Sequence, residues 1–407
     1  MIHNLLIAAA LLAPQVAKHK TADTVKLSTG KEYVGRVVYE DESKILMRVR
    51  SKPHEFDVAD VAAVQTLERS QRELFARLDG GAALDASGLL ELADFAAERG
   101  LVGEARMLYA KAIFADAESP EAFEALDGRE HKQKGWQVKI GKRWKTLPEI
   151  RERHGKWKEH FEVETTHFIV RSDMPAERVV DLALDVERYY LAFYDVLGAR
   201  LNLHAFDALP TVNAYEESGR MPKPPTAIDA WYAEVRNEFD ISADGGVNRT
   251  LIAREMTRLM LSNSLRKTFG KAGNLTPWAA RGIADMFASA VLVGQRPMAF
   301  DFTRVFDEYF RVHAQAKKPV SIKRLLTMGN AEFWGQGDGS NEAAAYTLVH
   351  FMIHGQDGKW SDGFRDFLES SYNGKGSATH FEKALGLRNL KELEESWNAY
   401  VKAAAGV

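Results

Sequence analysis

Short runs of alternating hydrophobic and polar residues occupy positions 23 to 67, and turn-forming residues separate them. Alternation with a period of two is typical of half-buried β-strands. Segments such as Ser28-Thr29-Gly30 interrupt the alternation, as expected for turns between strands. The pattern therefore predicts five strands, at Thr24–Leu27, Glu32–Glu40, Lys44–Val49, Glu55–Val58 and Val61–Leu67.

The hydrophobic period becomes helical from Leu89 to Leu126, where apolar residues recur every three or four positions. Gly100 and Pro120 interrupt this run, as residues at helix ends do. We predict a helical hairpin over 80–128 whose spacing is tetratricopeptide-like. A solenoid normally needs about three repeats, so we interpret this single hairpin as a structural spacer rather than a peptide-binding groove.

Beyond residue 160 a few predicted strands are followed by a series of predicted helices. The strands are 166–172 (THFIVRS), Leu209–Tyr215 and Phe239–Ser242, and a helix with apolar positions from Val179 to Leu197 follows the first of them. The later helical segments are Arg249–Ser264, Pro277–Val293, Ser321–Thr327, Glu342–His354 and Leu390–Lys402. This order of elements is typical of an α+β domain, which we place at 161–405.

The predicted architecture is therefore multi-domain. The strands at 22–68 fit a small β-barrel of the SH3-like or Sm-like kind, and the helical hairpin follows at 80–128. A connector at 129–160 leads to the α+β domain at 161–405. At about 150 residues per domain, a chain of 407 residues suggests two or three domains.

Composition places the chain among globular proteins. Hydrophobic residues make up 45% and charged residues 27%, which excludes a disordered, collagen-like or polytopic membrane protein. The 54 basic and 57 acidic side chains give a net charge of −3, so there is no overall attraction to nucleic acid or anionic lipid. The absence of cysteine excludes disulfides, iron-sulfur clusters, thiolate zinc sites and cysteine nucleophiles.

The first seventeen residues are typical of a cleaved signal peptide. The apolar run Leu5–Ala13 is followed by small residues and then by Lys18 and Lys20. A membrane-spanning helix needs about 20 apolar residues, and no stretch of the chain is long enough, so we predict no transmembrane segment. We expect residues 1–17 to be removed and the mature protein to be extracytoplasmic, either periplasmic or secreted. The alternative is a frayed hydrophobic N-terminus.

The connector at 129–160 is basic, with eleven Lys or Arg residues against four Glu, and it contains Trp136, Trp144 and Trp157. Basic and aromatic side chains together can bind a nucleic-acid strand or a cell-wall polyanion. Alternatively, the tryptophans pack on the following domain while the lysines stay solvated. We favour packing, and predict no nucleic-acid partner, because an exported protein rarely meets nucleic acid.

Four segments of the α+β domain carry a resemblance to a known family. They are the strand at 166–172, the helix at 251–261 (LIAREMTRLML), the segment Pro277–Asp285 and the helix at 346–354 (YTLVHFMIH). Together they resemble a zincin-like peptidase domain of the gluzincin type. The most similar group is the peptidase-MA-like domain of exported bacterial proteins, often labelled a domain of unknown function. The resemblance covers most of 161–405, although Pro277 directly abuts Trp278 where the family has one residue between them.

The resemblance implies that the metal ligands have been lost. The family motif Ala-His-Glu-x-x-His falls on Ala-Arg-Glu-Met-Thr-Arg, which puts Arg254 and Arg258 at the two zinc histidines and Glu255 at the general base. Arg281 stands at the third ligand. Arginine has no acceptor atom and does not deprotonate in proteins, and at about 4 Å from a divalent ion it costs roughly 8 kcal/mol. We therefore predict no metal, no cofactor and no catalytic residue, with Glu255 as a relic general-base position.

Two alternatives to this interpretation stay open. Arg254, Glu255 and Arg258 fit a polar stripe on an otherwise apolar helix, and they also fit ordinary solvated charges. His350 and His354 lie four residues apart, as a metal-binding pair does, but the neighbouring sequence offers no third ligand, so packing is the simpler interpretation.

The predicted function is that of an exported pseudopeptidase that binds or scaffolds. The alternative is an active metallopeptidase with a non-standard site. Its partner is unknown, with a peptide, a glycan or an envelope protein as candidates. Three arginines neutralised only by Glu255 and Asp285 would leave a cationic pocket for a small anion such as phosphate, unless the side chains extend outward over a closed cleft.

Overall fold

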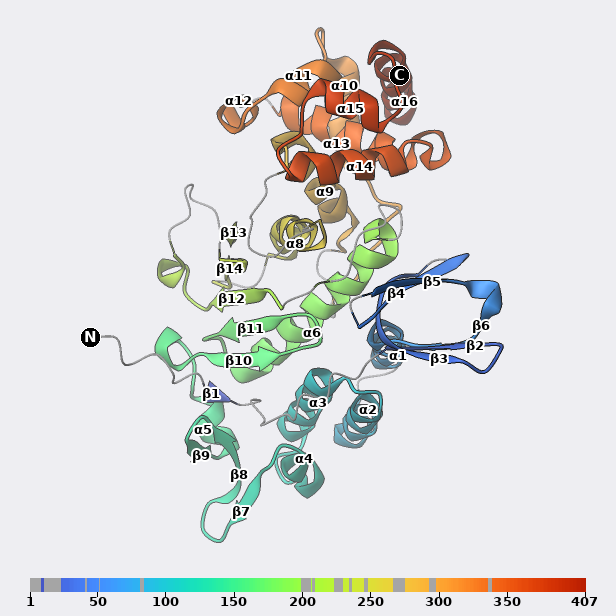
Figure 1. Ribbon diagram of the computed structural model, residues 1–407. Helices are drawn as coiled ribbons and strands as arrows, with labels where there is room; N and C mark the ends of the chain where they lie inside the picture. The colour runs from blue at the N-terminus through green and yellow to red at the C-terminus, as the bar shows by residue number, and fades with distance from the viewer. Residues whose placement is uncertain are drawn as a thin grey trace, which may run out of the picture. The chain divides into compact units, whose positions relative to one another are not determined.

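The structure is a computed structural model with an antiparallel sheet at the N-terminus, then helices, then a mixed α+β region (Figure 1). It describes residues 9–10, 23–265 and 275–407, apart from gaps at 41, 51, 81–83, 199–205, 207–208, 223–229, 234–235, 245–247, 293–297 and 336–338. The predicted signal peptide at 1–17 lies outside the described residues except for Ala9 and Ala10, which form the short strand β1.

The chain divides into two compact units. The N-terminal unit comprises Met1–Leu191, Phe206–Ala233 and Asn237–Asn248, and the C-terminal unit comprises Ala192–Ala205, Glu234–Arg236 and Arg249–Val407. This division falls inside the segment 161–405. The strands of that segment belong to the N-terminal unit, and the helices after Asn248 belong to the C-terminal unit.

The first sheet contains five antiparallel strands in the order β5-β4-β3-β2-β6. They are β2 (Asp23–Leu27), β3 (Glu32–Glu40), β4 (Lys44–Val49), β5 (Lys52–Asp57) and β6 (Val61–Gln65). Alternate residues fill its core, which contains Val25, Val37, Ile45, Met47 and Phe56. The five predicted strands are therefore confirmed, while the SH3-like or Sm-like assignment stays a prediction.

The sequence pattern missed the helix that follows this sheet. β6 ends at Gln65 because the hydroxyl of Thr66 accepts a hydrogen bond from the backbone N–H of Arg69 and caps α1 (Leu67–Asp79). The predicted hairpin then appears as α2 (Ala86–Glu98) and α3 (Val102–Ala115), followed by α4 (Pro120–Ala125). Gly100 joins α2 to α3 with φ +77°, a conformation that favours glycine.

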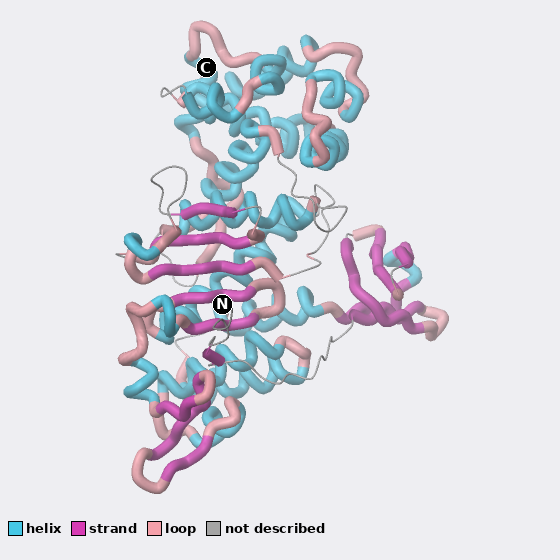
Figure 2. Tube along the Cα trace, turned by 60° about the vertical axis from the view of Figure 1, so that its left-hand side comes forward, coloured by secondary structure: helices cyan, strands magenta, loops and turns pink. Residues whose placement is uncertain are grey.

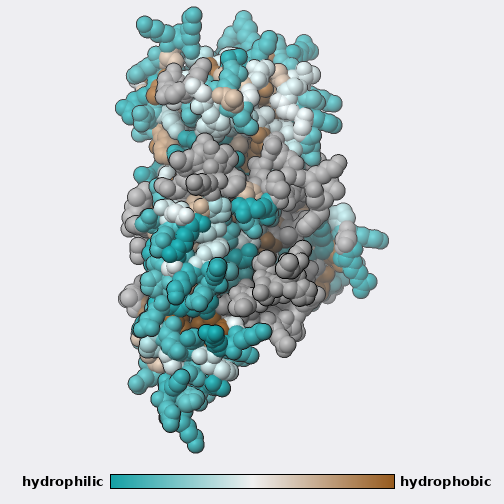
Figure 3. Space-filling view, turned by 90° about the vertical axis from the view of Figure 1, so that its left-hand side faces the viewer, coloured by the Kyte–Doolittle hydropathy of each residue, from teal (hydrophilic) through white to brown (hydrophobic). Residues whose placement is uncertain are grey.

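The basic segment forms a small three-stranded sheet and a short helix, namely β7 (Arg129–His131), β8 (Gly135–Ile140), β9 (Arg143–Lys145) and α5 (Leu147–Arg151). Its tryptophans pack on neighbours. Trp136 stacks on Phe123 of α4, and Trp157 stacks on Tyr215 with 4.1 Å between ring centroids. Lysines at the β7–β8 turn are exposed, and Figure 3 shows this turn, at the lower tip of the view, as hydrophilic. These contacts favour packing over nucleic-acid binding.

The second sheet of the N-terminal unit has six strands in the order β1-β10-β11-β12-β14-β13 (Figure 2). The strands not yet placed are β10 (Phe161–Glu164), β11 (Ile169–Ser172), β12 (Thr211–Tyr215), β13 (Ala230–Ala233) and β14 (Glu238–Ser242). β11, β12 and β14 are parallel to one another, β10 runs antiparallel to β11 and parallel to β1, and β13 runs antiparallel to β14. The amphipathic helix α6 (Ala176–Phe193) buries its apolar face and continues into the π-helical turn η3 (Tyr194–Gly198), so the predicted helix is confirmed.

The C-terminal unit is helical. It contains α8 (Arg249–Ser264), α9 (Pro277–Ala290), α10 (Asp307–Gln315), α11 (Ile322–Thr327), α12 (Asn330–Gly335), α13 (Ser340–His354), α14 (Ser361–Tyr372), α15 (Ala378–Ala384) and α16 (Lys391–Ala405). α13 is buried along most of its length. α9 packs tightly on it at Gly282, where an added Cβ would lie only 2.4 Å from the carbonyl oxygen of Ala345. Within the described residues, no helix has the length and apolarity to cross a membrane.

Candidate functional site

The helix α8 carries three of the four predicted site residues. Its apolar side chains, such as Ile252 and Met260, are completely or almost completely buried, which orients the helix. Arg254, Glu255 and Arg258 therefore lie on its more accessible side, with exposed side-chain fractions of 28%, 12% and 35%. These values place the two arginines at the boundary between core and solvent.

The neighbouring helix α9 packs against α8 and brings two charged residues to this boundary. Asp285 is completely buried and accepts from Arg254 Nε at its Oδ1 (2.6 Å) and from Arg281 Nε at its Oδ2 (2.5 Å). Its Oδ2 also accepts from the Tyr309 hydroxyl at 3.4 Å. One carboxylate thus holds two guanidinium groups, one from each helix.

The electrostatics of the cluster follow from Asp285. Burial by itself lowers the pKa of Arg281, but the adjacent Asp285 carboxylate more than offsets this effect, so the pKa lies above its ordinary value. Burial, and then the negative charge of Asp285, raises the pKa of Tyr309. The arginine therefore stays charged and the tyrosine stays a neutral donor.

The third arginine has a different partner. Arg258 donates from Nη1 to Glu255 at 3.0 Å, one helical turn earlier on α8. The prediction placed Glu255 between Arg254 and Arg258, whereas Arg254 binds Asp285 because α9 approaches from that side. Three guanidinium groups and two carboxylates leave one net positive charge in this group of residues.

The cluster reaches the surface beside an exposed aromatic ring. The Arg281 guanidinium lies 5.3 Å from the ring centre of Trp334 on α12, and Trp334 is 51% exposed. Arg254 and Arg281 contact Asp285 through Nε. Since a guanidinium has five N–H donors, the Nη nitrogens of both side chains retain capacity to bind an anion.

These residues do not fit a zinc ion. The positions that would need imidazole or carboxylate donors hold guanidinium groups, which offer no lone pair. Across the residues with described placement, no three His, Asp or Glu side chains are grouped to hold a metal. His350 instead hydrogen-bonds through Nδ1 to the Tyr400 hydroxyl at 2.7 Å, and burial, with a contribution from His354, lowers its pKa to about 3. His350 is therefore neutral and packed.

In comparisons with known proteins, no family model matches the chain and no curated protein is significantly similar to it.

Proposed function

We propose that the chain is an exported pseudopeptidase that binds or scaffolds a partner and does not hydrolyse peptides. The observation that carries this proposal is the bridge from Asp285 to Arg254 and Arg281, two of the three positions where the gluzincin-like resemblance implies zinc ligands. A buried carboxylate occupies the centre of the cluster, and cations surround it. This arrangement opposes metal binding, because a divalent ion beside Asp285 would meet the positive charge of both guanidinium groups.

The remaining parts fit accessory roles in such a protein. We assign the five-stranded sheet to an SH3-like or Sm-like module and the pair α2 and α3 to a tetratricopeptide-like spacer. A peptide, a glycan or an envelope protein is the class of partner that an extracytoplasmic protein would meet. The surface beside Trp334 and Arg281 is the place where we expect contact, because it combines an exposed aromatic ring with positive charge.

The first prediction concerns metal and peptide cleavage. We expect protein purified from its native host to contain well below one zinc per chain and to leave a peptide library uncut, since the described residues offer no ligand set that supports an activated water. Elemental analysis measures the zinc content, and mass spectrometry of the digests measures peptide cleavage. The mass of the intact chain separately shows whether the residues up to Ala17 have been removed. Stoichiometric zinc, together with chelator-sensitive proteolysis that Glu255→Ala removes, would instead support the active metallopeptidase.

A second prediction concerns the net positive charge. We expect phosphate or sulfate to raise the melting temperature of the wild type with a saturable dose dependence, by about 5 °C at a hundredfold excess over Kd. Arg281→Ala should abolish this response. The matched control is Arg324→Ala, which removes a 54% exposed arginine from α11 of the same unit and should keep it. An increase no larger than that given by chloride at equal ionic strength would mean that the arginine cluster does not bind these anions.

A further inference from the structure

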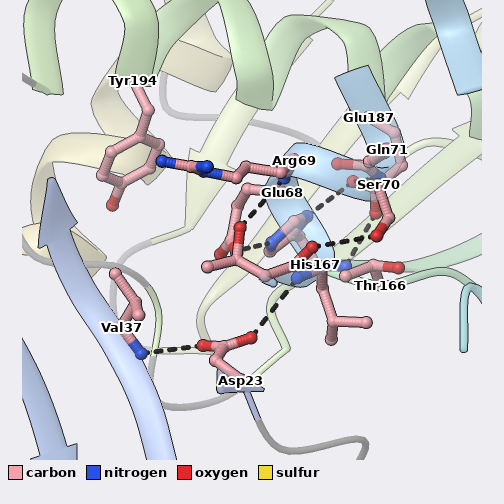
Figure 4. Close-up of polar contacts among 12 residues, drawn as sticks. Asp23, Val37, Glu68, Arg69, Ser70, Gln71, Thr166, His167, Glu187 and Tyr194 are labelled. Atoms are coloured by element: carbon pink, nitrogen blue, oxygen red, sulfur yellow. Dashed lines mark hydrogen bonds and ion pairs between the residues drawn. The ribbon is translucent and has the colours of Figure 1, made fainter. Parts of the chain in front are cut away.

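A buried polar cluster lies inside the N-terminal unit. We call it the His167 cluster, and its members come from α1, α3, α6 and the turn that precedes β11 (Figure 4). They are Glu68, Gln71, Glu104, His167 and Glu187, of which only Glu68 has a side chain more than 2% exposed. Three carboxylates with one imidazole in a protein interior require a specific distribution of protons.

His167 is held in its charged form. Its Nδ1 lies 2.7 Å from Glu187 Oε2, and its Nε2 lies 3.5 Å from Glu68 Oε1. Both ring nitrogens face carboxylates, and both can donate only when the ring is an imidazolium. Burial opposes the charge, but Glu187 and Glu68 more than offset it and raise the pKa of His167 to about 9.

Glu187 is held as a carboxylate. It accepts hydrogen bonds from the His167 backbone N–H (2.7 Å), the His167 ring, the Gln71 side-chain amide (2.7 Å) and the Thr165 hydroxyl. Burial alone raises the pKa of Glu187, but the charge and donors of His167 outweigh it, and the pKa falls below its ordinary value.

Glu104 is the carboxyl group with no cation of its own. The Nε2 of Gln71 lies 2.7 Å from Glu104 Oε1 and 2.7 Å from Glu187 Oε2, so two completely buried carboxyl groups share one nitrogen. The other contacts of Glu104 are the hydroxyl and the backbone N–H of Thr166, at 2.9 and 3.3 Å. Among the described residues no lysine or arginine is paired with Glu104, and His167 is already held between Glu187 and Glu68.

Two such carboxyl groups do not both ionise at low cost, so the proton that the cluster retains belongs to Glu104. A neutral carboxyl group can donate to the Thr166 hydroxyl, whereas the ionised group adds an uncompensated negative charge beside Glu187. Burial, and then the charge of Glu187, raises the pKa of Glu104 to about 7. The geometry and the direction of this pKa agree.

The first sheet is linked to the cluster through Asp23. This 6% exposed carboxyl group accepts from the backbone N–H of Val37 in β3 (2.7 Å) and of Leu67, the first residue of α1 (3.3 Å). Burial and the nearby Glu68 raise its pKa to about 6, and Arg36 is the cation that acts on both Asp23 and Glu68. Raising the pH from 5 to 8 therefore adds negative charge at Asp23 and at Glu104.

We propose that the His167 cluster is a proton-controlled joint, in which protonated Glu104 holds α1, α3 and α6 together and its ionisation at alkaline pH loosens them. The direction follows from linkage. A carboxyl group whose pKa is higher in the folded state stabilises fully below its ordinary pKa of 4.5, and that contribution is lost as the pH rises through about 7. The first sheet and the hairpin reach the six-stranded sheet partly through these helices, so the joint makes their attachment depend on pH.

The test is hydrogen exchange on the full chain between pH 5.5 and 8.5, corrected for the intrinsic pH dependence of exchange. We expect the ionisation of Glu104 to lower wild-type protection in α1 and α3 by about 30-fold over this range, as ordinary and folded-state pKa values near 4.5 and 7 require, in addition to the losses from Asp23 and His167. Glu104→Gln keeps the shape and hydrogen-bonding capacity without the titration, so its protection should fall about 30-fold less than that of the wild type, and the remaining pH dependence comes from Asp23 and His167. The matched control, Glu98→Gln on the exposed side of α2, should behave as wild type.

Equal pH dependence in wild type and Glu104→Gln would overturn the proposal. If that variant fails to fold, carbon-13 NMR of the wild type with labelled glutamate carboxyl groups decides the question. One glutamate titrating near pH 7 is the expected result, and a spectrum in which every glutamate titrates below about pH 5 overturns it.

Discussion

Asp285→Ala should destabilise the C-terminal unit by about 3–5 kcal/mol, because it leaves two guanidinium groups at the edge of the core without a carboxylate. Asp285 has no exposed surface, and Arg254 and Arg281 are only 28% and 20% exposed, so water replaces the lost partner poorly. A loss of this size lowers the melting temperature of a unit of roughly 170 residues by about 10 °C.

Thermal unfolding followed by calorimetry measures this change, with two comparison variants. Asp285→Asn keeps the shape but removes the charge, and it should lose most of the same stability. Glu255→Gln breaks the pair with the 35% exposed Arg258 and should cost less than about 1 kcal/mol. If all three variants melt together with the wild type, the arginines are solvated and the buried bridge does not contribute to stability.

Glu187→Gln should destabilise the N-terminal unit by about 3–5 kcal/mol near pH 6, because it leaves the His167 imidazolium buried with only Glu68 beside it. The pKa of Glu187 is lower in the folded state than its ordinary 4.5, so its contribution is present above pH 4.5 and is lost as the pH falls through the folded-state pKa. The difference between wild type and variant should therefore shrink on acidification below pH 4.5.

Urea unfolding at several pH values measures this difference. The informative comparison is Glu104→Gln, which should stabilise the same unit at pH 8.5, where Glu187→Gln destabilises it. If Glu104→Gln raises the free energy of unfolding and Glu187→Gln lowers it, charge is the cause, because the substitution is the same and the two glutamates share one glutamine nitrogen. Two losses of equal size would show that the cluster depends on shape alone.

The elements that the sequence predicted best are those whose pattern is local. β3, β4 and α8 begin and end where predicted, because alternation, turn residues and the apolar face of a helix are all visible within a few positions. α9 was predicted to continue to Val293, but it ends at Ala290 because Val291 leaves the helix to pair with Phe300. That partner lies nine residues away along the chain.

Other elements were missed or began at a different residue than predicted. α1 was missed although its apolar residues Leu67, Leu74, Phe75 and Leu78 recur at helical spacing, and the inward Ser70 and Gln71 add two buried polar positions to the same face. The Thr66 cap was a second local signal for this helix. The strand predicted at 166–172 begins at Ile169, since Thr166 and His167 form a turn whose donors bind Glu104 and Glu187.

The two polar clusters also differ in how well the sequence predicted them. A spaced motif pointed to Arg254, Arg258 and Arg281, and Asp285 lies within the second motif segment. The members of the His167 cluster are spread from residue 68 to residue 187, so no spacing connects them before the chain folds. A single histidine and scattered glutamates look like surface residues in a sequence, and only the packing of α1, α3 and α6 brings them together.

The bridge at Asp285 also limits which single substitutions the chain can tolerate at this site. Introducing His at position 254 or 281 alone would not create a metal site, because the other arginine would remain and Asp285 would have lost one of its two guanidinium partners. Each single substitution would give a less stable protein, and only simultaneous changes at several positions would avoid that loss of stability. The charge arrangement would therefore oppose a stepwise change of these positions to metal-binding residues.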